Sequence, residues 1–197
     1  MTRFALLFVL LLSACSALGR ASAPLDAYTL QPLAAVQGPS GTRHLVVELP
    51  TASGALTTDR ILIKPTPLQA QYLPKGRWVD PVPELVQTLL VASLQNSGGF
   101  RLVGRDGAGL TPDFVALVEV NDFQAEAPDP ATQQTPVHVG LTLTLLHEVD
   151  GHLISSRRFD AIGMAVNAKT LNVVAAFDAA TRQVLSDAVT WVNRTAR

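Results

Sequence analysis

The most constraining feature of the sequence is a run of strand-like segments in its second half. Residues 113–127 (DFVALVEVNDFQAEA) and 135–150 (TPVHVGLTLTLLHEVD) contain long stretches in which apolar and polar residues alternate, and residues 151–161 continue the pattern. Alternation is typical of strands with one buried face. Asp150-Gly151 joins the last two segments and is a strong signal for a tight hairpin. These residues therefore predict neighbouring antiparallel strands.

Two further segments have the spacing of helices that would cover such a sheet. Asp80 can cap the first helix, with Pro81 in its first turn and Gly98 at its end. Its apolar stripe comprises Val82, Leu85, Val86, Leu89, Leu90 and Leu94. A second helix is predicted from about 174 to 194. Its apolar side comprises Phe177, Val184, Leu185, Ala188, Trp191 and Val192.

Shorter strands are predicted in residues 43–50, 60–65 and 100–103. In the second of these, RILIKP, isoleucines alternate with basic residues. Pro65 and Pro67 exclude a central strand at this point, so this strand is expected at an edge of the sheet, followed by an extended loop to the first helix.

Together these segments predict an α+β fold, a two-layer sandwich in which two long helices pack on one face of a mainly antiparallel sheet. The expected order is strand, strand, helix, four strands and helix. The chain is 48% hydrophobic and 16% charged, a composition that excludes a disordered protein. Its formal net charge of −1 argues against a nucleic-acid partner, which usually requires a clustered basic face.

The first residues predict export and lipid anchoring. Nine apolar residues (4–12) follow Arg3, a run shorter than the roughly 20 residues that cross a bilayer and typical of a cleaved export signal. Leu12-Ser13-Ala14-Cys15 then matches the bacterial lipobox. Cys15 is the only cysteine, which excludes an internal disulfide, and we predict that its thiol is acylated. The alternative is an ordinary secretory signal that contains a cysteine.

The chain is therefore expected to have three parts. Residues 1–14 form the signal peptide, residues 15–27 the acylated amino terminus and a flexible tether, and residues 28–197 a single domain. Ser16 follows the cysteine in place of the aspartate that commonly retains lipoproteins in the inner membrane. This favours the outer membrane with the domain facing the periplasm, and the periplasmic face of the inner membrane is the alternative.

Candidate chemistry is sparse. His147 and His152 in HEVDGH are five residues apart on a hairpin, whereas zinc proteases use a spacing of four on a helix, so no metal site is expected. His138 sits singly in a strand, and isolated carboxylates such as Asp122 cannot be paired in space from the sequence. No catalytic constellation and no cofactor are predicted. Trp78 is open to two interpretations, a core residue beneath the first helix or an anchor for a partner.

Several short motifs, in order, carry a family resemblance. They are YTL (28–30), a strand ending in Leu49-Pro50, DRILIK (59–64) and RWVDPVPELVQTLLVASL (77–94). The chain resembles the ABC-type transport auxiliary lipoprotein family, which includes the lipoprotein subunit of the paraquat-inducible MCE system. Members commonly have an aspartate-arginine strand and then an arginine-tryptophan pair that leads through proline into a helix. The matching positions here are Asp59, Arg60, Arg77, Trp78 and Pro81, whereas Pro65 and Pro67 depart from the family pattern.

The resemblance implies a non-enzymatic subunit of an envelope lipid-transport system. Its expected partners are an MCE-domain periplasmic protein, through it an ABC permease and ATPase, and membrane lipid through Cys15. We predict that the partner contacts Arg60, Lys64, Arg77 and Trp78, with the proline-flanked tip at 126–136 as the second place. The alternative function is a stand-alone periplasmic lipoprotein that binds an apolar ligand between sheet and helices, and a cryptic hydrolase ranks last.

Overall fold

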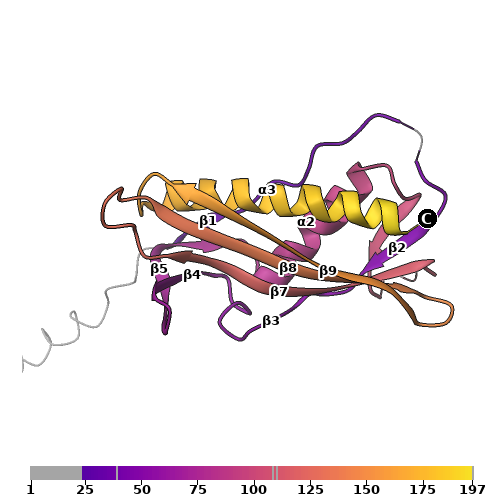
Figure 1. The fold of residues 1–197 in the computed structure, drawn as a ribbon, viewed down its shortest axis with the longest axis horizontal. Coiled ribbons are helices and arrows are strands. Elements are labelled where there is room, and N and C mark those ends of the chain that lie inside the picture. The colour runs from indigo at the N-terminus through magenta and orange to yellow at the C-terminus, as the bar shows by residue number, and fades with distance from the viewer. Residues whose placement is uncertain (1–23, 39, 108, 110, 197) are drawn as a thin grey trace, which may run out of the picture.

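The computed structural model describes residues 24–38, 40–107, 109 and 111–196, which form one sheet with two helices on one of its faces (Figure 1). The elements are β1 (Asp26–Tyr28), β2 (His44–Val47), β3 (Thr51–Ala52), β4 (Arg60–Thr66), β5 (Gln69–Trp78), α2 (Val82–Asn96), β6 (Leu102–Arg105), β7 (Phe114–Glu126), β8 (Thr135–His147), β9 (His152–Ala165) and α3 (Thr170–Thr195). The predicted α+β class and its two layers are confirmed. Neither helix is apolar enough over a sufficient length to cross a membrane.

Strands β7, β8 and β9 form the predicted antiparallel run. Val118 on β7 lies opposite Leu143 on β8, which in turn lies opposite Arg157 on β9. The chain reverses between β8 and β9 at Gly151, whose φ of 64° suits glycine far better than other residues. The hairpin predicted at this point is confirmed.

The second edge of β7 pairs with three short strands in succession. β2 pairs with its start, β3 with its middle and β4 with its end, all in parallel. β6 extends the sheet beyond β2, while β5 and then β1 extend it beyond β4. The sheet is therefore mixed, with its longest pairings antiparallel as predicted and its short strands β1, β2, β3 and β6 paired in parallel. The helix α2 lies between β5 and β6 in the chain, and such a crossover lets later strands run parallel to earlier ones.

The prediction that residues 60–65 form an edge strand is wrong. β4 lies inside the sheet, with β5 on one side and β7 on the other. Its pairing with β7 covers residues 62–64, so Pro65 need not donate a hydrogen bond to that neighbour. Pro67 lies in the turn that leads into β5. Two prolines near the end of a strand are therefore compatible with a central position.

Residues 69–78 are a strand, β5, and not the extended loop that the sequence predicts. Pro74 and Gly76 interrupt its apolar pattern, and its register with β4 shifts between Leu62 and Arg60. The first residues of β5 are exposed, so they lack the alternation that identifies a half-buried strand. The loss of that signal explains why the strand was missed.

Both predicted helices are present. The N-cap of α2 is Pro81, which has an extended backbone, and no side chain caps this helix; the prediction of Asp80 as the cap is therefore wrong. The helix α3 begins at Thr170, four residues before the expected start, and its predicted apolar side is buried. It packs closely across β8 and β9. A Cβ atom at Gly163 of β9 would come within 2.2 Å of the carbonyl oxygen of Ala176, so glycine permits this close approach.

Candidate partner-binding surface

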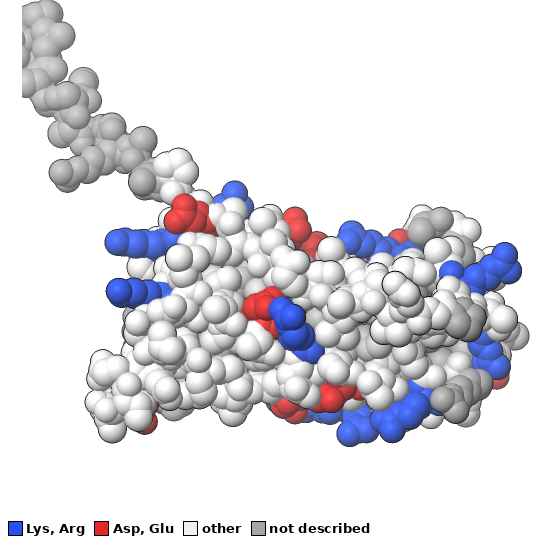
Figure 2. Space-filling model, turned by 90° about the horizontal axis from the view of Figure 1, so that it is seen from above, with Lys and Arg blue, Asp and Glu red and all other residues white. Residues whose placement is uncertain are grey.

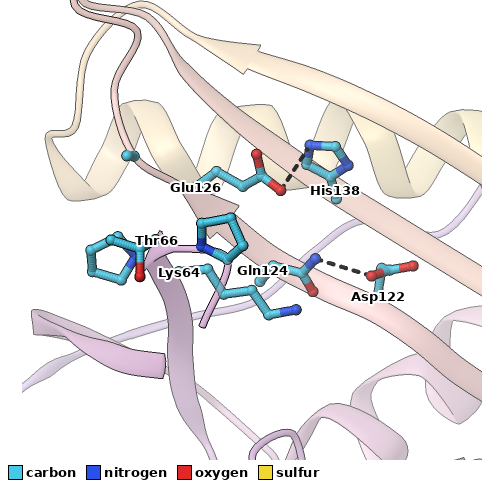
Figure 3. A pocket seen from close by; sticks show the side chains of 9 residues that line it. Lys64, Thr66, Asp122, Gln124, Glu126 and His138 are labelled. Atoms are coloured by element: carbon cyan, nitrogen blue, oxygen red, sulfur yellow. Dashed lines mark hydrogen bonds and ion pairs between the residues drawn. The ribbon is translucent and has the colours of Figure 1, made fainter. Parts of the chain in front are cut away.

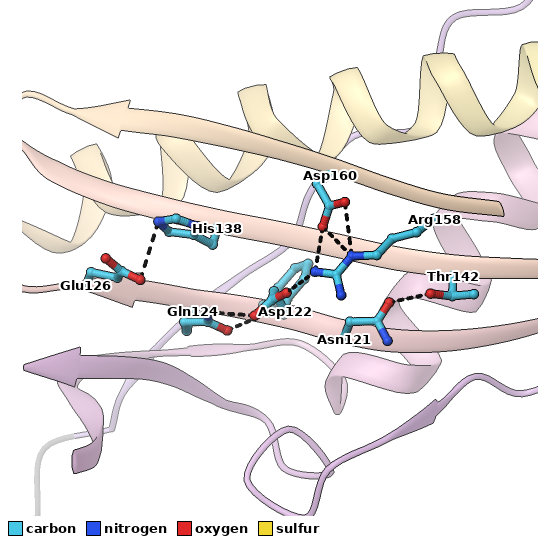
Figure 4. A network of polar contacts seen from close by, with 9 residues as sticks. Asn121, Asp122, Gln124, Glu126, His138, Thr142, Arg158 and Asp160 are labelled. Atoms are coloured by element: carbon cyan, nitrogen blue, oxygen red, sulfur yellow. Dashed lines mark hydrogen bonds and ion pairs between the residues drawn. The ribbon is translucent and has the colours of Figure 1, made fainter. Parts of the chain in front are cut away.

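The face of the sheet opposite α3 carries three groups of paired polar side chains. These side chains lie in front of β7, β8 and β9, with α3 behind the sheet (Figure 4). The set comprises Asn121, Asp122, Gln124, Glu126, His138, Thr142, Arg158 and Asp160. We call these eight residues the open face. On β8 and β9, and on β7 from Asp122 onward, they occupy alternate positions, because the side chains of a strand point to opposite sides of its sheet in turn. Asn121 directly precedes Asp122, where the register of β7 with β8 shifts.

Arg158 on β9 connects two carboxylates of the open face. Its Nε donates to both carboxylate oxygens of Asp160 at 2.8 and 3.0 Å. Its Nη2 reaches across β8 and donates to Oδ2 of Asp122 on β7 at 2.7 Å. Hydrogen bonding to Asp160 is the main cause that raises the pKa of Arg158 above its ordinary value. Gln124 also donates to Asp122, at 3.1 Å, so the contacts continue along β7.

The bridge across β8 depends on a glycine. Gly140 lies opposite Asp122 on one side and opposite Asp160 on the other. A Cβ atom at this position would lie 2.7 Å from Oδ1 of Asp160 and 3.1 Å from Oδ2 of Asp122. Two carboxylates therefore occupy the space that a larger residue would need, and this lets one guanidinium bind both.

A polar groove of about 320 Å³ lies where the open face meets the end of β4 (Figure 3). Its polar walls are Lys64, Asp122, Gln124, Glu126 and His138, with Pro65 and Pro67 beside them. Lys64 is in register with Glu126 on the neighbouring strand. Nε2 of His138 lies 3.4 Å from Oε1 of Glu126. The groove therefore presents groups of both charges to a partner.

Of the four residues predicted to bind a partner, Lys64 alone lines this groove. Arg60 and Arg77 lie opposite each other on β4 and β5. Nη1 of Arg77 donates to Oδ2 of Asp59 at 3.1 Å, in a half-exposed ion pair. The guanidinium of Arg60 lies 5.6 Å from the centre of the Tyr72 ring and is partly buried. Both arginines thus contribute contacts within the sheet.

Trp78 lies in the core, with a relative exposure of 0%. Its ring packs edge-on against Phe177 of α3 at 5.1 Å and against Phe123 of β7 at 5.7 Å between centroids. Its Nε1 has no hydrogen-bond partner. The interpretation of Trp78 as a core residue therefore fits its position. Because the ring is buried, none of its surface is available to a partner.

Two other features of the sequence take no part in this surface. Cys15, predicted to be acylated, lies outside the described residues. The HEVDGH segment forms the β8–β9 turn, where Nδ1 of His147 lies 3.2 Å from Oδ1 of Asp150. The backbone N–H of His152 is the main cause that lowers the pKa of Asp150. Within the described part of the chain, no three His, Cys, Asp or Glu side chains gather in a geometry that could hold a metal ion.

The arrangement is suited to recognition. Its charged groups are held by neighbours at defined distances, and such pre-ordered groups lose less conformational freedom when a partner binds. The sequence reasoning missed Arg158 and Asp160, included Glu126 only as the first residue of the tip at 126–136, and left His138 and Asp122 unpaired. The alternation of residues 135–147, which puts His138, Gly140 and Thr142 on one face, was the available signal.

Comparison with known proteins gives a family and a relative. A family model described as ABC-type transport auxiliary lipoprotein component matches residues 28–189. Over 150 residues, the chain is 27% identical to an uncharacterized protein of Bradyrhizobium diazoefficiens. That match covers 75% of this chain and 38% of the relative, so the chain spans well under half the length of this relative.

Solved structures share the fold. The crystal structure of protein XCC0632 from Xanthomonas campestris aligns with a TM-score of 0.77 and 25% identity, covering 88% of this chain and 97% of that one. The crystal structure of an uncharacterized protein aligns with a TM-score of 0.62 and 18% identity, covering 82% and 99%. The second likeness concerns the fold alone.

Proposed function

Because this chain belongs to the family of ABC-type transport auxiliary lipoprotein components, we propose that it is the non-enzymatic docking subunit of an envelope lipid-transport system. Acylated Cys15 anchors it in the outer membrane, with the domain in the periplasm. The domain binds an MCE-domain periplasmic protein and, through it, the ABC permease and ATPase. The lipid anchor in this proposal is based on the lipobox, and the MCE, permease and ATPase partners are based on the family resemblance.

The observation that carries the docking role is the open face. Helices α2 and α3 cover the other face of the sheet (Figure 1), so the open face is the broad sheet surface left to a partner. The contacts of Arg158 with Asp122 and Asp160 hold its charged groups in place. Polar groups that complement a partner supply specificity and steer association more than they add affinity.

The polar groove brings together the two places that the sequence singled out for partner binding. Lys64 comes from the strand predicted to face the partner, and Glu126 begins the proline-flanked tip at 126–136 named as the second place. Both line the same groove, so one partner segment can contact both. In this proposal Lys64 contacts the MCE partner directly, whereas Arg60 and Arg77 support the strands that carry it.

The size of the apolar cavity argues against the alternative function. A stand-alone carrier needs a pocket that encloses most of its ligand, typically about 300–1,000 Å³. The apolar pocket between the sheet and the start of α3 has a volume of about 190 Å³. That volume holds a small part of a lipid, so docking to a partner is the better-supported function.

Reversal of the charge at Lys64 tests the docking surface. In the full chain, Lys64→Glu is expected to weaken co-purification with the MCE-domain partner about tenfold, equivalent to roughly 1.4 kcal/mol, because it puts a second carboxylate beside Glu126. The circular dichroism spectrum and melting temperature should stay at wild-type values, since Lys64 is partly exposed. Adding Arg60→Glu should cost stability as well, because Arg60 packs over Tyr72.

Arg101→Glu is the matched control. Arg101 is exposed in the segment before β6, at the other end of the sheet. Its substitution by Glu makes the same change of charge as Lys64→Glu, but away from the groove. It should leave co-purification unchanged. Equal recovery of the partner with Lys64→Glu and with wild type would assign the interface to another surface.

A further inference from the structure

One end of the domain carries the polar groove with Lys64 and also holds further features that the docking role does not use. The described chain begins near this end, and β4, β7 and β9 finish there, while β5, β8 and α3 start there (Figure 1). We call it the proximal end. If Cys15 is acylated, as proposed above, this end lies close to the bilayer. Pro24 is the ninth residue after Cys15, and nine residues span at most about 30 Å when fully extended.

An apolar pocket of about 190 Å³ lies at the proximal end, between the sheet and the start of α3. Its walls include Ile63, Pro65, Leu73, Ala125, Ala168 and Val173. We call it the end pocket. An apolar cavity of roughly 150 Å³ can hold benzene, so the end pocket has room for a short length of hydrocarbon.

The end pocket contains one buried polar group without a partner. Thr135 lines the pocket with a relative exposure of 2%, and its hydroxyl oxygen has no hydrogen-bond partner among the residues that the structure describes. A buried hydroxyl without a partner usually costs stability. The rest of the pocket wall is almost entirely apolar. A hydrocarbon chain can therefore pack against this wall without a polar group of its own.

All three lysines of the sequence lie at the proximal end, although the chain holds fifteen basic residues. Lys64 comes directly before Pro65, and Lys169 comes directly after Ala168; both Pro65 and Ala168 belong to the wall of the end pocket. Lys75 and Lys169 line a second hollow together with Asp26. Figure 2 shows positively charged side chains projecting from this end of the molecule. Lysines at a membrane surface attract anionic headgroups.

Exposed apolar side chains lie near Lys64 and Lys169 in the sequence. Leu68, at the tip between β4 and β5, is fully exposed, and Val166 and Leu171 on either side of Lys169 are exposed by 66% and 68%. Exposed apolar groups next to lysines are typical of surfaces that enter the headgroup region of a membrane. The proximal end therefore combines an apolar pocket, basic side chains and apolar projections.

We infer that the end pocket binds the terminal part of one acyl chain of an anionic bilayer phospholipid. Lys75 and Lys169 contact its phosphate, and Leu68, Val166 and Leu171 enter the headgroup region. The rest of the lipid stays in the bilayer, because the pocket is too small for a whole chain. The inference rests on the proposed lipid anchor only for the source of the lipid.

Lipid binding can be measured without the anchor or the partner. The mature chain (residues 15–197) with Cys15→Ser is titrated calorimetrically with tetradecanoyl lysophosphatidylglycerol below its critical micelle concentration, and with glycerophosphoglycerol, the same headgroup without a chain. We expect one lysolipid per protein and no heat of binding from the bare headgroup.

Ala168→Trp should weaken lysolipid binding at least tenfold by closing the pocket, whereas Ala35→Trp, at an exposed site outside the pocket, should leave it unchanged. Thr135→Val, which keeps the shape of the side chain, should also bind as wild type does.

Flotation with phosphatidylglycerol vesicles tests the bilayer as the source. Lys75→Gln with Lys169→Gln should reduce vesicle binding roughly fivefold per lysine at low salt, while Lys64 is left in place for partner assays. Unchanged lysolipid binding by Ala168→Trp, loss of binding in Thr135→Val, or failure to float with vesicles would overturn the inference. None of these outcomes depends on the MCE partner, so the docking proposal stands or falls separately.

Discussion

Trp78→Ala is expected to lower the free energy of unfolding by about 3–5 kcal/mol, the usual cost of removing a large buried aromatic side chain. The indole is completely buried and contacts Phe123 and Phe177, so its loss leaves a cavity between the sheet and α3. The bond that Nε1 does not make adds nothing to this cost, which therefore comes from packing alone. Urea denaturation monitored by circular dichroism measures the change.

Val79→Ala is a suitable control for this substitution. Val79 is the next residue, is exposed by 44%, and should change stability by no more than about 0.5 kcal/mol. A loss below about 1 kcal/mol for Trp78→Ala, with an unchanged denaturant slope, would contradict the core position. A folded Trp78→Ala protein that had lost its partner would instead revive the interpretation of Trp78 as an anchor.

Cys15→Ser is expected to remove the stable anchor, so that the processed protein leaves membranes washed at physiological salt, and to leave unprocessed precursor. Serine has no thiol to accept an acyl chain, so the processed variant lacks the proposed anchor. Stable anchoring requires more than one hydrocarbon chain, which acylation at the mature amino terminus would supply. Fractionation of membranes followed by immunoblotting measures the distribution.

Substitutions at Ser16 test which membrane holds the protein, without changing the acylated cysteine. Ser16→Ala should remain in the outer-membrane fraction, whereas Ser16→Asp should move to the inner membrane. Recovery of processed Cys15→Ser protein with the outer membrane would show that the protein is held by something other than an acyl group.

The predictable part of the fold is the part whose pattern is local. Strands β7, β8 and β9 show a period of two and are joined by a turn with its own sequence signal, and both helices show a period of 3.6. β1 and β3 have only three and two residues, too few to show a period. The three parallel partners of β7 were beyond sequence reasoning, because their pairing joins residues that are far apart in the chain.

The candidate surface was predictable only in outline. Lys64 was chosen because it alternates with isoleucines, and it does line the polar groove. Its expected edge position was wrong, since two prolines at the end of a strand give the same signal as prolines on an edge strand. Asp122 and Asp160 are 38 residues apart in the sequence and meet only through Arg158, so no local pattern connects them.

Purification of the full, acylated chain from detergent-solubilised envelopes tests the central claim most directly. After mild cross-linking, mass spectrometry should identify an MCE-domain protein together with an ABC permease and its ATPase. Their recovery should exceed that from a strain expressing Lys64→Glu at an equal level. Purification of the anchored protein without these components, or with equal amounts of them from Lys64→Glu, would contradict docking through the open face.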